Sequence, residues 1–275
     1  MYKVIVSFTT SPSRLLRVRP VIESLLKQDY EVAGIEINLP KKYKNVEEYI
    51  LPDFLELNPD SNICKHYPKV KIFRIENDLG PGTKIVPTIL RYINNPEPNI
   101  YLVSVDDDNK YPEKLVSSLL KGMKLYGESH IYCIGGYNLR LASKCRVELD
   151  EISEGKVSVV EGIYGVLYNP RLFTDDLGSY FCKVMENKKC FTSDDITISN
   201  YLAFKEISII KLYFKSFNKI LFWKYLMFKG GKISASKNDG NAIHKMSGGH
   251  KKRYFEACVW LKEQKMLFLP IKFTQ

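Results

Sequence analysis

The sequence predicts an α/β protein with a mostly parallel, doubly wound sheet, and three observations predict this class. Five short apolar segments alternate with helical patterns over the first 135 residues, as in a parallel sheet with crossover helices. The segments are rich in β-branched residues, which is typical of strands buried on both faces. A run of carboxylates follows one segment, and open α/β sheets bind ligands beyond the carboxyl ends of their strands.

The first half of the chain supplies five expected strands and three expected helices. The strands are residues 3–8, 32–39, 70–75, 100–105 and 130–134, and the helices are residues 15–26, 85–92 and 112–126. Pro20 either kinks the first helix or marks its true first turn. The basic stretch after residue 40 is expected to be irregular, with one short helix at 46–51, and Gly135-Gly136 is expected to end the fifth strand.

The pattern changes after residue 135. Residues 157–168 are strand-like but contain two glycines, which permit a bulge or a close approach of the backbone to a ligand. A short helix is expected from Asn169 to Phe173, after which a mixed segment follows. Residues 192–203 form a capped helix with two acidic residues in its first turn, and residues 254–265 form a last helix that packs back on the domain.

Three consecutive carboxylates, Asp106, Asp107 and Asp108, stand immediately after the fourth expected strand. Adjacent like charges repel, and a divalent cation would relieve the repulsion, because Mg²⁺ and Mn²⁺ prefer carboxylate oxygens together with substrate phosphates. The plainer interpretation is a solvated acidic turn that caps the helix after Pro112. The position at the end of a buried strand favours the metal site.

Two turns are candidate phosphate-binding segments. The polar turn after the first strand carries helix-capping residues and Arg14, so its backbone N–H groups and the guanidinium could hold an anion. A capped helix with a surface arginine explains this turn equally well. Gly80 to Lys84 is a glycine-rich turn before a helix. It is not a P-loop, because the glycine spacing and the residues after the lysine are wrong.

The composition describes a globular chain with an anionic partner. The chain has 275 residues, of which 45% are hydrophobic, and a formal net charge of +10, which suggests nucleotide phosphates, nucleic acid or a membrane surface. Nucleic acid is not expected as a partner, because the basic residues are spread along the chain and no recognised module is present. The six cysteines form no Cys-x-x-Cys pair, so a reducing compartment is expected and a zinc site is not.

The expected location is the cytoplasm, because the chain enters its first strand directly and no apolar span is long enough to cross a membrane. Residues 208–228 are apolar, aromatic and basic. They could make a peripheral contact with a membrane interface, or they could form buried strands and a helix with snorkelling lysines. The second interpretation is preferred.

Taken together and in order, these motifs resemble those of nucleotide-sugar glycosyltransferases of the GT-A fold, including small family-2-like enzymes of bacteria and large DNA viruses. The resemblance covers residues 2–250 and rests on the aspartate triplet, Glu161 to Gly165, Asp194-Asp195, Ala242 to His244, Phe8 to Arg14, and Gly80 to Lys84. It implies one catalytic domain over 1–275, with a nucleotide-binding half at 1–135, an acceptor half at 136–250 and a C-terminal helix at 251–275. It also leaves open a viral protein in an infected cell.

The resemblance implies a role for each motif. Asp108 would coordinate Mn²⁺ or Mg²⁺, Asp106 would contact the metal or the ribose, Asp107 would assist, and His244, or else His250, would complete the metal site. Asp195 or Asp194 would take the proton from the acceptor hydroxyl, with inversion at the sugar. The nucleotide pocket would be lined by Thr9, Arg14, Asp78 and Lys84. The floor beneath the sugar would be formed by Glu161, Gly162 and Tyr164.

The implied activity is metal-dependent transfer of a sugar from a nucleoside-diphosphate sugar, a UDP-sugar by default, to a glycan, lipid-linked or protein acceptor. Two alternatives stay open. A nucleotidyltransferase would require a glycine-rich loop after the first strand, and Thr9 to Arg14 contains no glycine. A catalytically inactive binding module on the same fold would not require the intact acidic motifs. The sequence does not indicate an oligomeric state.

Overall fold

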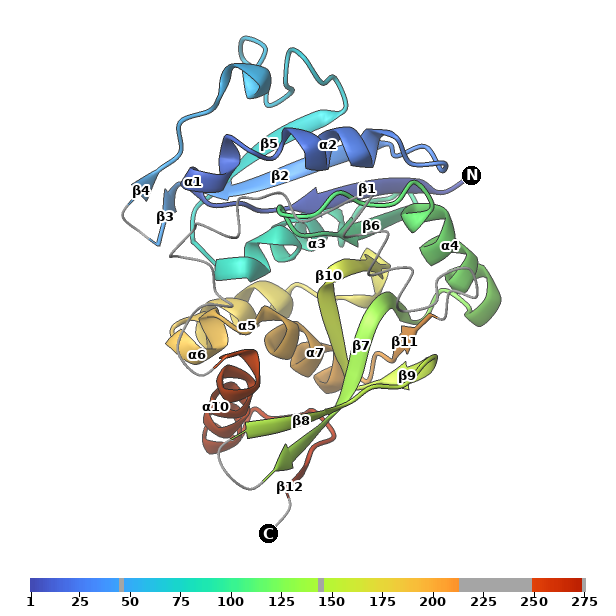
Figure 1. Ribbon diagram of the computed structural model, residues 1–275, viewed down its shortest axis with the longest axis vertical. Coiled ribbons are helices and arrows are strands. Elements are labelled where there is room, and N and C mark those ends of the chain that lie inside the picture. The colour runs from blue at the N-terminus through green and yellow to red at the C-terminus, as the bar shows by residue number, and fades with distance from the viewer. Residues whose placement is uncertain (45–46, 143–145, 213–248, 274–275) are drawn as a thin grey trace.

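The computed structural model of the chain describes residues 1–44, 47–142, 146–212 and 249–273. Within them, one ten-stranded sheet has the order β5-β2-β1-β6-β10-β7-β11-β9, with β8 and β12 paired to β7 (Figure 1). The strands are β1 Lys3–Phe8, β2 Gly34–Pro40, β5 Val70–Ile75, β6 Ile100–Ser104, β7 Ile131–Ala142, β8 Arg146–Asp150, β9 Gly155–Val157, β10 Val159–Tyr168, β11 Ile209–Lys211 and β12 Lys272–Phe273. A separate short ribbon pairs β3 Lys42–Tyr43 with β4 Glu47–Glu48.

The sheet is parallel in its N-terminal half and mixed beyond it. β1 pairs in parallel with β2 and β6, and β2 pairs in parallel with β5. β10 then runs antiparallel between β6 and β7, while β7 runs parallel to β11. The expected α/β class, with a mostly parallel sheet and a smaller mixed region, is confirmed. The insertion of β10 between the fourth and fifth expected strands is not visible in the local pattern.

Helices cover both faces of this sheet (Figure 1). They are α1 Pro12–Leu15, α2 Arg19–Leu26, α3 Val86–Tyr92, α4 Leu115–Tyr126, α5 Asp176–Met185, α6 Lys188–Phe191, α7 Asp194–Phe204 and α10 Gly249–Glu263, with short 3-10 turns η1 Asp53–Leu55, η2 Gly80–Lys84 and η3 Pro170–Leu172. Side chains of alternate residues in β6 point to opposite faces of the sheet. Tyr101 and Val103 pack in the core with α2 and α4, and Ile100 and Leu102 pack in the core with α3, α5, α7 and α10.

The first expected helix is two helices. α1 ends at Leu15 and α2 begins at Arg19, with Pro20 in the first turn of α2. Proline is tolerated there because the first N–H groups of a helix have no intrahelical partner. The structure thus selects the first-turn interpretation of Pro20 over the kink.

Two expectations about local structure are wrong. Gly135-Gly136 does not end a strand, since β7 continues to Ala142 in register with β10. The short helix at 46–51 is absent from the described residues there, where Glu47–Glu48 is extended and paired. The segment after Phe173, for which no helix or strand was predicted, contains α5 and α6, whose apolar residues pack against partners that the local sequence does not reveal.

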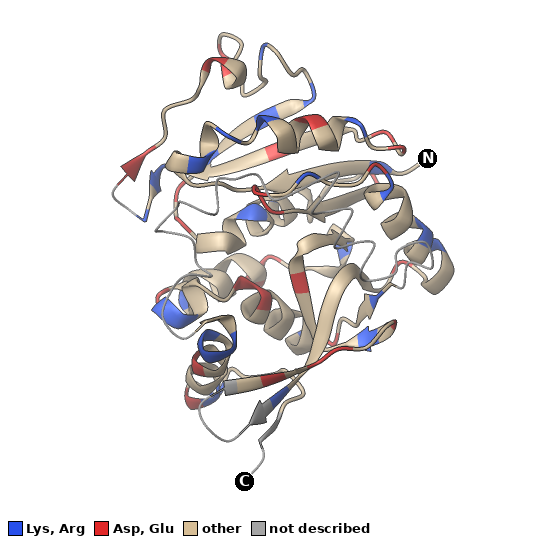
Figure 2. Cartoon of the chain, in the orientation of Figure 1, with Lys and Arg blue, Asp and Glu red and all other residues tan. Residues whose placement is uncertain are grey.

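Two further segments bear on the membrane question. Ile209–Lys211 of the 208–228 stretch is the core strand β11, and residues 213–228 lie outside the described residues, as does His244. Among the described helices, none combines the length and the apolar character needed to cross a bilayer. Lysine and arginine segments are spread over both halves of the ribbon rather than gathered on one element (Figure 2).

Candidate functional site

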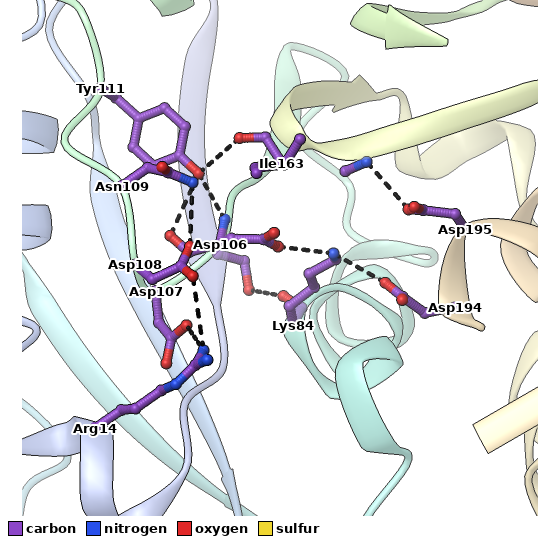
Figure 3. Close-up of polar contacts among 12 residues, drawn as sticks. Arg14, Lys84, Asp106, Asp107, Asp108, Asn109, Tyr111, Ile163, Asp194 and Asp195 are labelled. Carbon is purple, nitrogen blue, oxygen red and sulfur yellow. Dashed lines mark hydrogen bonds and ion pairs between the residues drawn. The ribbon is translucent and has the colours of Figure 1, made fainter. Parts of the chain in front are cut away.

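The loops after β1 and β6 begin at the same edge of the sheet, because these strands are parallel neighbours. The loop after β1 carries Thr10 and Arg14, and the loop after β6 carries the three aspartates. The Thr10 hydroxyl donates to Asp107 Oδ2 at 2.5 Å, and Arg14 Nη1 donates to Asp107 Oδ1 at 2.9 Å (Figure 3). One carboxylate of the triplet is therefore held by a neutral and a cationic donor from the neighbouring strand.

The protein's own cations offset part of the repulsion within the triplet. Burial raises the pKa of Asp107 to about 6, Arg14 opposes the rise, and Asp108 adds to it. Asp108 is almost buried, accepts a hydrogen bond from Asn109 Nδ2 at 3.1 Å, and lies 3.9 Å from Arg14. Part of the charge balance at this edge thus comes from side chains, whereas the sequence analysis considered a metal ion or a solvated acidic turn.

Lys84 lies between two acidic segments of the site. Its Nζ is 2.9 Å from Asp106 Oδ1 and 2.9 Å from Asp194 Oδ2 (Figure 3), and its side chain is only 8% exposed. Burial opposes its charge, but Asp106, Asp194 and Asp195 outweigh burial and raise its pKa well above the ordinary value. Lys84 is therefore a fixed cation that joins the loop after β6 to the start of α7.

A buried polar network fixes the backbone at Lys84. The Ser7 hydroxyl of β1 donates to the Lys84 carbonyl at 2.6 Å. Asn38 Nδ2 of β2 donates to Ser7 Oγ at 3.0 Å and to Thr88 Oγ1 of α3 at 2.9 Å. Buried polar groups that satisfy one another in this way specify a single arrangement. The η2 turn is consequently anchored to two strands and a helix beneath the site.

Asp194 and Asp195 form the first turn of α7. Asp195 Oδ1 accepts a hydrogen bond from the backbone N–H of Gly162 at 3.0 Å, and its Oδ2 accepts one from the Tyr254 hydroxyl at 2.9 Å. Burial raises the pKa of Asp195 to about 8, the neighbouring Asp194 adds to the rise, and Lys84 opposes it. The two acids therefore differ: Asp194 is ion-paired, and Asp195 is a half-buried acid with two donors.

Gly162 allows these side chains to meet the backbone of β10. A Cβ at this position would lie 2.6 Å from Lys84 Nζ and 3.2 Å from Asp195 Oδ1. The pairing of β10 with β7 shifts register between Glu161 and Val166, and bulges of this kind often lie beside functional sites. A small pocket opens here, lined by Gly82, Lys84, Ile85, Val160, Gly162, Tyr168, Phe181, Asp194, Asp195 and Ile198.

Glu161 and Tyr164 lie on the same segment of β10 and pack over Gly135 of β7. A Cβ on Gly135 would lie 2.4 Å from Tyr164 Cδ2 and 2.9 Å from Glu161 Oε2. Burial raises the pKa of Glu161, and Lys211 of β11 opposes the rise. No hydrogen bond from a described residue reaches the Glu161 carboxylate.

The remaining two residues expected in the nucleotide pocket have structural contacts. The Thr9 hydroxyl donates to the Asn38 carbonyl at 2.7 Å. Asp78 accepts hydrogen bonds from the backbone N–H groups of Lys44 at 2.7 Å and Gly80 at 2.8 Å. Thr9 and Asp78 therefore shape the loops around the site, whereas Arg14 and Lys84 reach the aspartates directly.

Sequence reasoning missed three contributors. Thr10 stands next to the expected Thr9 and contacts Asp107 in its place. The Tyr111 hydroxyl accepts a hydrogen bond from the Asp106 N–H at 2.8 Å and donates to the Ile163 carbonyl at 3.1 Å, which joins the aspartate loop to β10. Its position within the 100–112 stretch was a usable signal. Tyr254 has no local signal, because it reaches Asp195 from α10.

The donors for a divalent cation are partly in place. Within the part of the chain that the structure describes, no group of three or more His, Cys, Asp or Glu side chains could hold a metal by itself. Asp106 and Asp108 are nevertheless two carboxylates of the same loop, and Mg²⁺-type sites commonly use one or two carboxylates plus substrate phosphates. His250 lies on α10 with its ring 5.8 Å from that of Tyr254. A cation at Asp106 and Asp108 would therefore depend on a phosphate ligand for its remaining donors.

Comparison with known proteins gives structural likeness only. No family model matches the chain, and no curated protein matches it. Among similar solved structures, one of S. aureus TarS has a TM-score of 0.43 at 14% identity and covers 78% of this chain. The chain spans 58% of that TarS structure, which is less than two thirds. TarS has also been solved with UDP-GlcNAc, and that complex has a TM-score of 0.41 at 12% identity, covering 78% of this chain and 57% of that one.

A second group of similar structures comprises a synthetase and a cytidylyltransferase. A CMP:2-keto-3-deoxy-manno-octonic acid synthetase complexed with CTP has a TM-score of 0.44 at 10% identity, over 78% of this chain and 89% of that one. The 2-C-methyl-D-erythritol 4-phosphate cytidylyltransferase of Francisella tularensis has a TM-score of 0.39 at 9% identity, over 68% of this chain and 81% of that one. At this level of similarity no activity transfers to the present chain.

Proposed function

We propose that the protein is a metal-dependent glycosyltransferase of the GT-A type, which moves a sugar from a nucleoside-diphosphate sugar to an acceptor hydroxyl. One observation carries the proposal: Lys84 joins Asp106, in the aspartate triplet, to Asp194, at the start of α7. The two acidic motifs expected to serve the donor and the acceptor are thereby joined through one cation, and Lys84, Asp194 and Asp195 line the small pocket beside it. UDP is the default nucleotide.

The donor side of the site suits an anionic leaving group. A departing nucleoside diphosphate carries concentrated negative charge, and fixed cations stabilise it most where water is excluded. Arg14 and Lys84 are such cations, with side chains 18% and 8% exposed. Asp106 and Asp108 would hold Mn²⁺ or Mg²⁺, which supplies Lewis-acid stabilisation of the diphosphate when bound. The net charge of +10 would steer the donor inward.

The acceptor side supplies a base. A general base works best when its pKa lies near the operating pH, and the pKa of Asp195 is raised to about 8. Its two oxygens together offer about four lone-pair sites, so two remain beyond the bonds from Gly162 and Tyr254. We assign to Asp195 the removal of the proton from the acceptor hydroxyl. We assign to Asp194 the positioning of Lys84, with which it forms an ion pair. Direct attack by that hydroxyl inverts the anomeric carbon, and Glu161 and Tyr164 would contact sugar hydroxyls.

The test is a thermal-shift panel of UDP, GDP, CMP and dTDP, each with Mn²⁺ and with chelator. We expect one nucleoside diphosphate with Mn²⁺ to raise the Tm by on the order of 5–10 °C at a hundredfold excess over Kd. Asp108→Ala should abolish this shift. Asp175→Ala is the matched control, because it removes an exposed aspartate at the start of α5 and should leave the shift unchanged.

Other outcomes separate the alternatives. A panel in which no nucleoside diphosphate shifts the Tm in either condition refutes the donor site. If a nucleoside diphosphate binds, incubation with the matching nucleotide sugar should release its sugar. Release of pyrophosphate from CTP or UTP in the presence of a sugar or sugar phosphate would instead identify a nucleotidyltransferase. Binding without turnover of any donor would identify an inactive binding module.

A further inference from the structure

The carboxylate of Asp195 accepts a hydrogen bond at each of its two oxygens. The Gly162 N–H of β10 donates to Oδ1 at 3.0 Å, and the Tyr254 hydroxyl of α10 donates to Oδ2 at 2.9 Å. Tyr254 is 7% exposed. A hydrogen bond from a neutral donor to a buried carboxylate is short, directional and stronger than one between neutral groups. Together the two donors leave the carboxylate little freedom to rotate.

The position of the Tyr254 hydroxyl is set by packing of its ring and of the helix that carries it. The ring stacks on Tyr137 of β7, with centroids 6.3 Å apart and planes at 29°. Ala257, Cys258 and Leu261 on the same helix are fully buried, and Lys189 of α6 forms an ion pair with Glu256 at 2.6 Å. The C-terminal helix is therefore docked firmly enough to present one phenol to the site.

We propose that Tyr254 is a positioning residue for Asp195, whose hydroxyl fixes the orientation of the carboxylate and stabilises its ionised form. The C-terminal helix, expected to do no more than pack back on the domain, thereby completes the acceptor side of the site. The catalytic consequence rests on the proposed role of Asp195 as a base. The contact itself, and the effect of Tyr254 on the charge of Asp195, do not depend on that role.

Several charged and titratable groups face Asp195 from the elements packed around it. They are Asp194 of α7, Lys84 of η2, Asp106 after β6, Cys133 and Tyr137 of β7, Tyr168 of β10 and Tyr254 of α10. Burial and the acids favour the protonated form of Asp195, whereas Lys84 and Tyr254 favour the ionised form. Removal of the Tyr254 hydroxyl should therefore raise the pKa of Asp195.

The experiment is a pH titration of ¹³C-labelled aspartate carboxyl carbons by NMR in the presence of chelator. The Asp195 signal is assigned by its loss in Asp195→Asn. In Tyr254→Phe the Asp195 titration should move upward by on the order of one pH unit. Tyr180→Phe is the control. The Tyr180 hydroxyl donates to the Thr197 carbonyl of α7, the helix that carries Asp195, at 3.1 Å, but it does not contact Asp195. Its Asp195 titration should stay in place.

An unmoved titration in Tyr254→Phe, or an equal movement in Tyr180→Phe, overturns the proposal. If Tyr254→Phe does not fold at pH 8, the double variant Tyr254→Phe/Asp195→Asn is compared with it by near-UV circular dichroism. Recovery of the native spectrum supports the proposal, because the neutral amide no longer needs a donor for a buried charge. Continued loss of the native spectrum overturns it. A negative nucleotide panel would refute the glycosyltransferase proposal and leave this result untouched.

Discussion

Lys84 is the residue on which the two acidic motifs converge. Its ammonium lies 2.9 Å from a carboxylate of the β6 loop and 2.9 Å from one at the start of α7. Gly162 makes this possible, because any larger residue would place a Cβ 2.6 Å from Lys84 Nζ. A charge in a buried position persists when its partners are near and well aligned. Loss of the ion pairs of Lys84 should therefore lower the stability of the protein as well as disrupt the site.

Replacement of Lys84 by methionine should destabilise the protein strongly. The change leaves Asp106 and Asp194, whose side chains are 31% and 16% exposed, without their shared cation. Breaking a fully buried pair costs about 3–5 kcal/mol, and partial exposure of Asp106 places the expected loss toward or below the lower end. The free energy of unfolding in urea at pH 7 measures it.

The control for this change is Lys3→Met, which breaks an exposed ion pair with Glu97. Exposed pairs contribute about 0–1 kcal/mol, so this variant should be close to wild type. Equal losses in the two variants would show that Lys84 is a surface-type cation and would contradict the bridging role described above.

At the scale of single elements, β7 shows how glycine serves packing rather than chain termination. Gly135 faces the Glu161 and Tyr164 side chains of β10, so the strand continues through it to Ala142. The pair of glycines has the local signature of a turn. Glycine is required at position 135 because side chains of the neighbouring strand β10 pack against it, and the local sequence does not predict this pairing.

Gly135→Ala should therefore destabilise the junction of β7 and β10. The new methyl would lie 2.4 Å from the Tyr164 ring, and overpacking of this kind costs about 1–3 kcal/mol. Gly34→Ala in β2 is the matched strand glycine, because its nearest contacts would be 3.5 Å and 3.6 Å away. It should be neutral or slightly stabilising. The free energy of unfolding of each variant is measured by urea denaturation. Equal losses of stability in Gly135→Ala and Gly34→Ala would contradict the packing argument.

The whole molecule should lose stability as the pH rises through the neutral range. The pKa of Asp195 is about 8 when folded, against about 3.9 in an unfolded chain. Between these values the folded state holds a proton that the unfolded state has released. This contribution to stability is complete below about pH 4 and is lost as the pH passes 8.

Asp195→Asn isolates this effect. The amide cannot ionise, so the variant does not share the loss of stability that wild type shows at higher pH. Its free energy of unfolding minus that of wild type should therefore increase from pH 5 to pH 9. The relative gain is at most about 1.4 kcal/mol per pH unit, and urea denaturation in chelator at each pH measures it. A difference between the two proteins that stays constant over this range would show that Asp195 is already ionised at pH 5.

Much of the fold was accessible from local patterns. Residues 3–8, 70–75 and 100–105 coincide with β1, β5 and β6 to within a residue, because buried parallel strands are continuous apolar runs bounded by polar turns. That Arg14 and the aspartate triplet lie at the same edge of the sheet followed from strand direction alone, whereas the pairing of β1 with β6 did not. α5, α6 and the place of β10 in the sheet did not follow, since pairing over long sequence distances leaves little local trace.

By itself the sequence determined the α/β class and the placement of Asp106, Asp107 and Asp108 at the end of a buried strand, because each depends on residues adjacent in the chain. Tertiary structure alone decided that Lys84 joins Asp106 to Asp194, and that Tyr254 donates to Asp195 from 59 residues away. These contacts depend on how α7, β10 and α10 pack against one another. Packing of that kind is a property of the folded chain as a whole.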